Sequence, residues 1–243
     1  MPSASPPPDR RERLIVALDV PSAAQARELV EEIGPGATFY KVGLELFVTG
    51  DYFELVEWLV KRGNKVFADL KMFDIPETVA RAVVNLRGHG ITFATVHGNQ
   101  SIMRAAAAEK GDLKILAVTV LTSLDRGDLD DLGFSCDVER LVLSRARRAM
   151  EAGCDGVVSS GLEVSRIKSE FHDRLLVVTP GIRPVDNRPV DNKPMDDQKR
   201  TVDVAQAFAN GADYIVVGRS IRQAPDPRAA AEAIQSTIAS IFP

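Results

Sequence analysis

Eight short runs rich in β-branched residues recur along the chain, and longer amphipathic stretches separate them. Periodic apolar residues predict helices in these stretches, several of which end at glycine. Strands that alternate with helices favour one parallel sheet. The predicted strands are 14–19, 38–43, 65–71, 92–97, 114–121, 155–160, 175–181 and 213–218, and the helices include 22–33, 51–63, 76–90, 138–153, 201–212 and 226–241. Eight such units in 243 residues predict an α/β fold, a single-domain (β/α)8 TIM barrel.

A doubly wound open sheet is the structural alternative. Its dinucleotide-binding versions carry a G-x-G-x-x-G motif after the first strand, and this chain has none there. The closed barrel is therefore the preferred prediction, and we assign it to residues 14–243 as one catalytic domain.

Two segments fall outside the regular pattern. Residues 1–13, "MPSASPPPDRRER", have a proline cluster and charges but no apolar signal-peptide region, and we predict a disordered tail. Residues 183–197 repeat a basic-Pro-apolar-Asp-polar pentad three times, within a long loop predicted at 182–200 after the seventh strand. In barrels the loops after strands seven and eight often hold a phosphate, although a low-complexity insertion is an alternative for the middle pentad.

The overall charge argues against large anionic partners. The formal net charge is −4, both signs are mixed along the chain, and no basic stripe is present, so we expect no nucleic-acid partner. No apolar run approaches the roughly 20 residues that cross a bilayer, so we expect a soluble protein without a membrane partner. Two cysteines without a secretory leader predict reduced thiols in a cytoplasmic protein, with packing roles for Cys136 and Cys154.

Charged residues end the first three predicted strands. Asp19 ends the first, Lys41 lies near the end of the second, and Asp69 and Lys71 end the third, with Asp74 just beyond. Residues two apart on a strand share a face, so Asp69 and Lys71 are predicted to point the same way while Leu70 faces the helices. Ordinary strand-end charges in water are the alternative, but partly buried ions cost several kcal/mol each unless they are paired.

A carboxylate and ammonium network of this kind suits decarboxylation. A substrate carboxylate near Asp69 would be repelled, and a carbanion beside the ammonium group of Lys71 would be stabilised and then protonated.

The ends of strands seven and eight carry arginines. "TPGIRP" contains Arg183, and "VVGRSI" contains Gly218 and Arg219. Glycine permits close approach of the backbone to an anion, and guanidinium groups bind phosphate in a bidentate manner. Gln198 would add a neutral donor, so these residues predict a phosphorylated substrate. Arg188 duplicates Arg183 in the repeat, but Arg183 adjoins the strand and is preferred.

Other polar residues at strand ends have less defined roles. Thr122 and Ser123 follow the fifth strand and are placed to read the polar edge of a ring. His97 ends the fourth strand, and we prefer a histidine bonded to a neighbouring strand over a catalytic one. No Cys, His or carboxylate cluster has metal-ligand spacing, so we predict no metal.

Together these motifs resemble the orotidine 5′-phosphate decarboxylase family over about residues 14–221. The carriers are "ALDV", "YKVG", "DLKMFDIPET", "TVHG", "VTVLTS", "DGVVSS", "TPGIRP", "DQKR" and "DYIVVGR". The resemblance implies conversion of orotidine 5′-monophosphate (OMP) to UMP in pyrimidine biosynthesis, by a homodimer without metal or organic cofactor.

The resemblance also implies a role for each matching residue. Lys41, Asp69, Lys71 and Asp74 would form the catalytic network, with Lys71 as proton donor to C6 and Asp74 reaching the partner's site. Substrate contacts would come from Asp19 and Lys41 to the ribose, Thr78 of the partner to the sugar-phosphate region, Thr122 to the pyrimidine, and Arg183, Gln198, Gly218 and Arg219 to the phosphate side.

The sequence differs from the motifs of this family in two places. The family's Gly-Asp-Gln is Asp196-Asp197-Gln198 here, and the repeated pentads are unfamiliar.

Two other functions are alternatives to this interpretation. A Mg²⁺-dependent sugar-phosphate decarboxylase or aldolase would need a carboxylate at the position of Lys41. A catalytically silent nucleotide-binding regulator would have no use for so costly a charge cluster.

Overall fold

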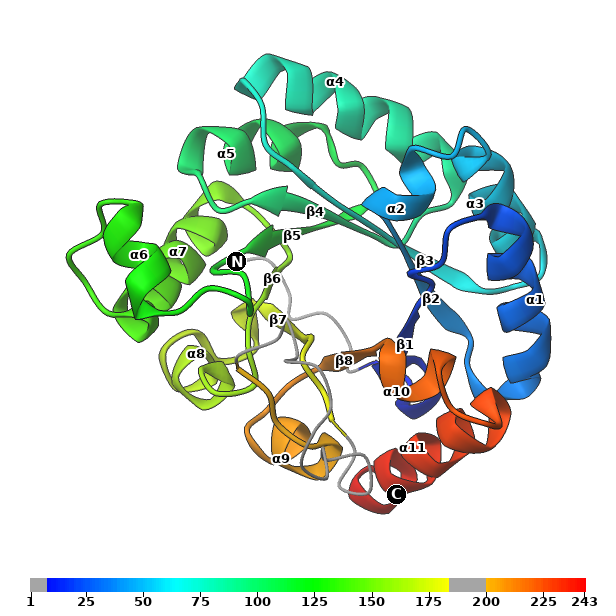
Figure 1. The fold of residues 1–243 in the computed structure, drawn as a ribbon. Coiled ribbons are helices and arrows are strands. Elements are labelled where there is room, and N and C mark those ends of the chain that lie inside the picture. The colour runs from blue at the N-terminus through cyan, green and yellow to red at the C-terminus, as the bar shows by residue number, and fades with distance from the viewer. Residues whose placement is uncertain (1–7, 184–199) are drawn as a thin grey trace.

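Eight parallel strands close into a barrel in the computed structural model, which describes residues 8–183 and 200–243. Each strand pairs with the next along the chain, and the last strand pairs with the first. Figure 1 shows the strands around a central axis with helices outside them. The strands are β1 (Leu14–Ala17), β2 (Phe39–Gly43), β3 (Lys65–Met72), β4 (Phe93–His97), β5 (Lys114–Val118), β6 (Gly156–Val158), β7 (Leu176–Thr179) and β8 (Tyr214–Val217). The predicted TIM barrel is confirmed, and the open-sheet alternative is wrong.

Helices follow the strands and carry the expected caps. The side chain of Ser22 accepts a hydrogen bond from the N–H of Gln25 at the start of the helix that follows the first strand, and Asp137 and Asp226 cap two later helices in the same way. The α-helices are α1 (Ala23–Ile33), α2 (Leu44–Phe47), α3 (Tyr52–Lys61), α4 (Pro76–Leu86), α5 (Gln100–Glu109), α6 (Arg126–Asp131), α7 (Val138–Ala152), α8 (Val164–Phe171), α9 (Val204–Ala209), α10 (Arg219–Arg222) and α11 (Pro227–Ile241). Short 3-10 helices are η1 (Arg10–Arg13), η2 (Gly34–Gly36), η3 (Arg87–His89) and η4 (His172–Arg174). No helix in the described ranges has the length and apolar character to cross a bilayer.

Aromatic side chains fill the barrel interior. The ring of Phe93 lies 5.1 Å from Phe39, 5.1 Å from Tyr214 and 6.0 Å from Phe67, measured between centroids. Small and branched residues such as Ile15 and Val178 complete this buried cluster. The interior of the barrel is thus filled by apolar side chains, and space for a ligand lies above them, at the carboxyl ends of the strands.

A second apolar layer joins the outer faces of the strands to the helices. Residues that alternate with the interior set, such as Ala68 and Ala94 beside Phe67 and Phe93, belong to it. Cys154 is buried in this layer, and burial raises the pKa of its thiol to about 12, so the thiol stays neutral. The packing role predicted for Cys154 is confirmed.

The start of the described chain belongs to the folded barrel. Residues 10–13 form η1, and the carboxylate of Asp9 accepts the N–H of Arg11. Arg13 is buried: its guanidinium lies 3.8 Å from the ring centroid of Phe242 and donates to the carbonyl of Asp213. The prediction of a disordered tail up to residue 13 is therefore wrong for residues 10–13, because a distant aromatic ring and carbonyl satisfy the arginine.

The two ends of the predicted long loop are joined. Ile182 and Val202 form a parallel β-bridge, and the N–H of Arg183 donates to the carbonyl of Val202 at 2.9 Å. Residues 184–199 between them lie outside the described residues.

Arg200 ties this region to two other loops. Its Nη1 lies 2.6 Å from Oε1 of Glu163, just before α8, and its Nη2 donates to the carbonyls of Val120 and Leu121 after β5. Both side chains are at most 10% exposed. Burial raises the pKa of Glu163, and the Arg200 guanidinium opposes that effect. The pair therefore holds three segments of the upper rim together.

Removal of Arg200 should strongly destabilise the barrel. We expect Arg200→Met to lower the free energy of unfolding by about 3–5 kcal/mol, because Glu163 becomes a buried carboxyl without its cation. The double variant Glu163→Gln/Arg200→Met should recover a large part of this loss. Urea unfolding followed by circular dichroism measures both. Arg81→Met, at the exposed pair with Glu77, is the matched control and should change stability by less than about 1 kcal/mol. A loss of that small size in Arg200→Met would contradict this account.

Candidate active site

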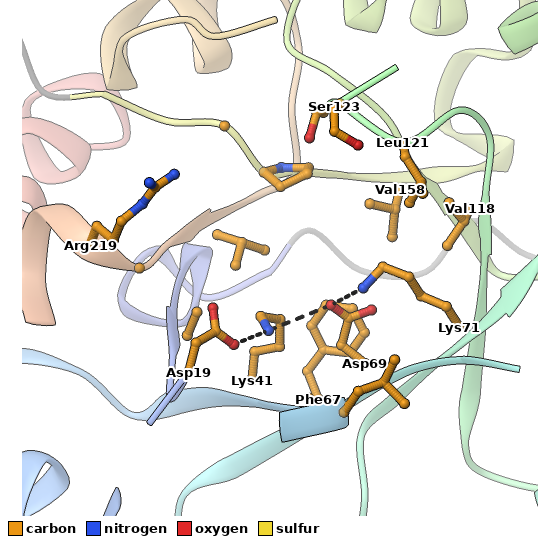
Figure 2. A pocket seen from close by; sticks show the side chains of 18 of the residues that line it. Asp19, Lys41, Phe67, Asp69, Lys71, Val118, Leu121, Ser123, Val158 and Arg219 are labelled. Carbon is orange, nitrogen blue, oxygen red and sulfur yellow. Dashed lines mark hydrogen bonds and ion pairs between the residues drawn. The ribbon is translucent and has the colours of Figure 1, made fainter. Parts of the chain in front are cut away.

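A cavity of about 610 Å³ opens at the carboxyl ends of the strands. It lies above the aromatic floor, where barrel enzymes place their active sites. Its walls include nine residues predicted from the sequence: Asp19, Lys41, Asp69, Lys71, Thr122, Ser123, Arg183, Gly218 and Arg219. Figure 2 shows four of them, Asp19, Lys41, Asp69 and Lys71, as one chain of alternating charges.

The charges in this chain are within contact distance of one another. Nζ of Lys41 lies 2.8 Å from Oδ1 of Asp19 and 3.6 Å from Oδ2 of Asp69. Nζ of Lys71 lies 2.8 Å from the same Oδ2 of Asp69. The carboxylate of Asp69 therefore lies between two ammonium groups.

Burial and pairing act against each other at the centre of the chain. Burial alone would raise the pKa of Asp69, but Lys41, Lys71 and the hydroxyl of Thr95 outweigh it and hold the pKa below its ordinary value. Burial alone would lower the pKa of Lys41, but Asp69 and Asp19 outweigh it and raise the pKa. Asp69 and Lys41 are thus both ionised at neutral pH, as a fixed pair of charges.

Lys71 reaches the cavity through an irregular stretch of β3. Its φ is +48°, in the left-handed region, and the register of β3 against β4 shifts between Ala68 and Met72. The prediction that Asp69 and Lys71 share a side of the chain while Leu70 packs outward is correct. Its stated reason, simple strand alternation, is wrong for Lys71, because a bulge and not a regular strand carries it.

Gly43 leaves the space that Lys41 occupies. A Cβ at this position would lie 3.2 Å from Nζ of Lys41 and 3.6 Å from Oδ1 of Asp19. A larger residue would therefore press on the ion pair. Gly43 was not predicted as a site residue, although it ends the predicted strand "TFYKVG" two residues after Lys41.

Guanidinium groups gather at the other side of the cavity. Arg219 begins α10 directly after Gly218, and Figure 2 shows its side chain across the cavity from Lys71. Arg183 and Arg222 also line the cavity. Arg222 was not predicted, but it lies three residues after Arg219 in the same helix, a spacing that places two side chains on one face. This side can accept a dianion such as a phosphate monoester.

The wall between the two charged sides is mixed. Val118, Leu121 and Val158 supply apolar surface, and Thr122, Ser123 and Ser159 supply hydroxyls. Thr122 is buried in the loop after β5, and Ser123 beside it is exposed. Such a wall suits a flat ring with a polar edge.

Asp74 and Thr78 lie outside the cavity of their own chain. Asp74 is exposed between β3 and α4, and its Oδ1 accepts the N–H of Ile75 at 2.6 Å. Thr78 is half-buried in the first turn of α4. The structure of one chain therefore does not bring these two predicted residues to the others.

The remaining predicted residues divide into two groups. Gln198 and Arg188 lie outside the described residues. His97 does not line the cavity; its ring lies 4.6 Å from the ring of Phe73, measured between centroids. Burial, helped by the guanidinium of Arg145, lowers the pKa of His97 and keeps its imidazole neutral at pH 7. Within residues 8–183 and 200–243, no three His, Cys, Asp or Glu side chains are grouped to bind a metal ion.

Comparison with known proteins agrees with this geometry. Residues 12–234 match the model of the orotidine 5′-phosphate decarboxylase / HUMPS family. The orotidine 5′-phosphate decarboxylase of Methylococcus capsulatus is 63% identical over 95% of this chain and 93% of its own length. The protein of that name from Stenotrophomonas maltophilia is 50% identical over 94% of this chain and 93% of its own length.

A solved structure extends the likeness to three dimensions. The crystal structure of orotidine 5′-phosphate decarboxylase from Lactobacillus acidophilus superposes with a TM-score of 0.81 at 35% identity, covering 93% of this chain and 99% of that one. With the barrel, the charged chain and these matches together, the protein belongs to the orotidine 5′-phosphate decarboxylase / HUMPS family.

Proposed function

We propose that this protein decarboxylates OMP to UMP in pyrimidine biosynthesis, without metal or organic cofactor. The observation that carries the proposal is the ionised Asp69 between Lys41 and Lys71, across the cavity from arginines. The names of the curated relatives supply the substrate. A cytoplasmic location accompanies the proposal and is supported by the free thiols of Cys136 and Cys154.

Each wall of the cavity has a part in this proposal. Arg183, Gly218 and Arg219 bind the phosphate side, and Gln198, which lies outside the described residues, would add a further donor. Asp19 and Lys41 contact the ribose, and Thr122 reads the pyrimidine edge. The substrate carboxylate then lies beside Asp69, and C6 lies beside the ammonium group of Lys71.

The reaction follows from these positions. The bond from C6 to the carboxylate breaks, carbon dioxide leaves, and the electron pair stays on C6. The fixed ammonium group of Lys71 stabilises this carbanion as it forms, because the charge needs no reorganisation in a site shielded from water. Lys71 then transfers a proton from Nζ to C6, which gives UMP, and solvent restores the proton to the amine.

A metal-dependent sugar-phosphate decarboxylase or aldolase is the second candidate, because such enzymes resemble this chain in the motif D-x-K-x-x-D, which residues 69–74 carry here. The position that would need a metal-binding carboxylate carries Lys41, whose ammonium group is already paired with Asp19 and Asp69. This cation argues against a bound divalent metal there.

We further propose that the enzyme is a homodimer with Asp74 and Thr78 at the partner's site. Asp74 is exposed between Phe73 and Ile75, whose side chains are 63% and 66% exposed. Exposed apolar residues also follow β2, with Leu44 54% and Val48 79% exposed. Large apolar side chains gathered at one rim mark a surface for another protein.

Loss of the Lys71 ammonium group should abolish turnover while the nucleotide still binds. We expect Lys71→Ala to lower kcat for OMP by at least about 10²-fold, because the variant loses both the proton donor and the ammonium group beside C6 of the substrate. The spectrophotometric assay of OMP loss, run with and without EDTA, measures this. Lys61→Ala, at an exposed lysine of α3, is the control and should leave kcat unchanged.

The same assay separates the candidate functions. Loss of wild-type activity in EDTA would indicate the metal-dependent alternative, and UMP binding without any turnover would indicate a regulator. A Lys71→Ala variant within about tenfold of wild type would contradict the assigned role.

A mixture of two inactive variants should regain activity if Asp74 acts in the partner's site. In a dimer of one Lys71→Ala chain and one Asp74→Ala chain, one site lacks both groups and the other is intact. Random pairing of equal amounts makes half of the dimers mixed, so about a quarter of all sites should be active. The experiment coexpresses the variants with different tags, and each variant alone is the control. Activity at the control level in purified mixed dimers would contradict the shared site.

A further inference from the structure

One residue of β4 stands opposite three residues of β3. The two strands pair regularly at Phe67–Phe93 and Ala68–Ala94, and pairing resumes at Met72–Val96. Residues 69–71 therefore face Thr95 alone, so that β3 holds two extra residues at this point. Bulges of this kind redirect side chains next to active sites, and they leave backbone groups without their ladder partners.

The hydroxyl of Thr95 supplies the missing partner. The backbone N–H of Lys71 donates to its Oγ1 at 2.9 Å, and the same hydroxyl donates to Oδ1 of Asp69 at 2.9 Å. A hydroxyl has one proton to donate and lone pairs to accept, so both bonds form at once. Thr95 is fully buried and does not line the cavity.

The two hydrogen bonds of Thr95 hold the backbone of Lys71 and the carboxylate of Asp69. The bond from the Lys71 amide fixes a residue whose left-handed backbone is unfavourable for any side chain with a Cβ. The bond to Asp69 engages Oδ1, while Lys41 and Lys71 approach Oδ2. One hydroxyl thus fixes both the carboxylate plane and the point from which the lysine side chain extends.

We propose that Thr95 is a positioning residue, which holds Asp69 and Lys71 in register without touching the substrate. This inference rests on the proposed function for its kinetic readout. It predicts that loss of the hydroxyl slows the chemical step more than it weakens binding, since small misplacements of catalytic groups reduce rate strongly.

The test compares four forms of this 243-residue chain. Thr95→Val keeps the shape but removes the hydroxyl, and we expect kcat for OMP to fall between about 10-fold and 100-fold while the Kd for UMP changes less than about threefold. Thr95→Ser restores the hydroxyl and should return kcat to within about fivefold of wild type. Thr179→Val is the matched control, because Thr179 is also fully buried on a strand and its hydroxyl has no partner among the described residues.

A second readout does not depend on turnover. Hydrogen exchange at the Lys71 amide should be at least about tenfold faster in Thr95→Val than in wild type or Thr95→Ser, because its acceptor is gone. A wild-type protein that leaves OMP intact would refute the proposed function, and amide exchange would still decide the role of Thr95. Unchanged kcat and unchanged exchange in Thr95→Val would overturn the inference. Equal losses of kcat and UMP affinity, without rescue by serine, would also overturn it.

Discussion

The ion pairs of Asp69 with Lys41 and Lys71 are the interaction on which the site depends. A buried carboxylate is stable only because two ammonium groups and the Thr95 hydroxyl surround it. The packed rings of Phe39, Phe93 and Tyr214 fill the barrel beneath, so water does not reach the charges from that side, and the side chains of Asp69 and Lys41 are only 11% exposed. Removal of either lysine would leave an excess of buried negative charge. Removal of Asp69 would leave the ammonium groups of Lys41 and Lys71 facing each other without the carboxylate between them.

The barrel places this charged chain at one side of the cavity and the arginines at the other. In the proposed reaction, binding energy from the remote phosphate would hold the substrate against groups that repel its carboxylate and stabilise its carbanion. Neither side would serve this purpose alone. The proposed dimer is compatible with this arrangement, because it would cover the exposed Asp74 and its exposed apolar neighbours Phe73 and Ile75.

Local sequence patterns were sufficient for the strands and for the charged residues that line the cavity at the ends of β1, β2 and β3. Each strand of the barrel lies within its predicted range or one residue beyond it, and the charges at the ends of β1, β2 and β3 meet as expected because parallel strands share a rim. The bulge in β3 was not predicted, because it depends on the register against β4 and not on any feature of "FADLKMF" itself. The contacts of Thr95, of Arg200 with Glu163, and of Arg13 with Phe242 were missed for the same reason, since each partner is distant in sequence.

The charge state of Asp69 tests the central claim most directly. Carboxyl ¹³C signals of labelled protein, with Asp69 assigned by its absence in Asp69→Asn, report ionisation as the pH is lowered. Because Lys41, Lys71 and Thr95 outweigh burial, the pKa lies below the ordinary value of 3.8, so the signal should stay in its ionised position from pH 8 to about pH 4. A titration of this signal with a midpoint above about pH 5 would show that burial dominates, and it would contradict the account.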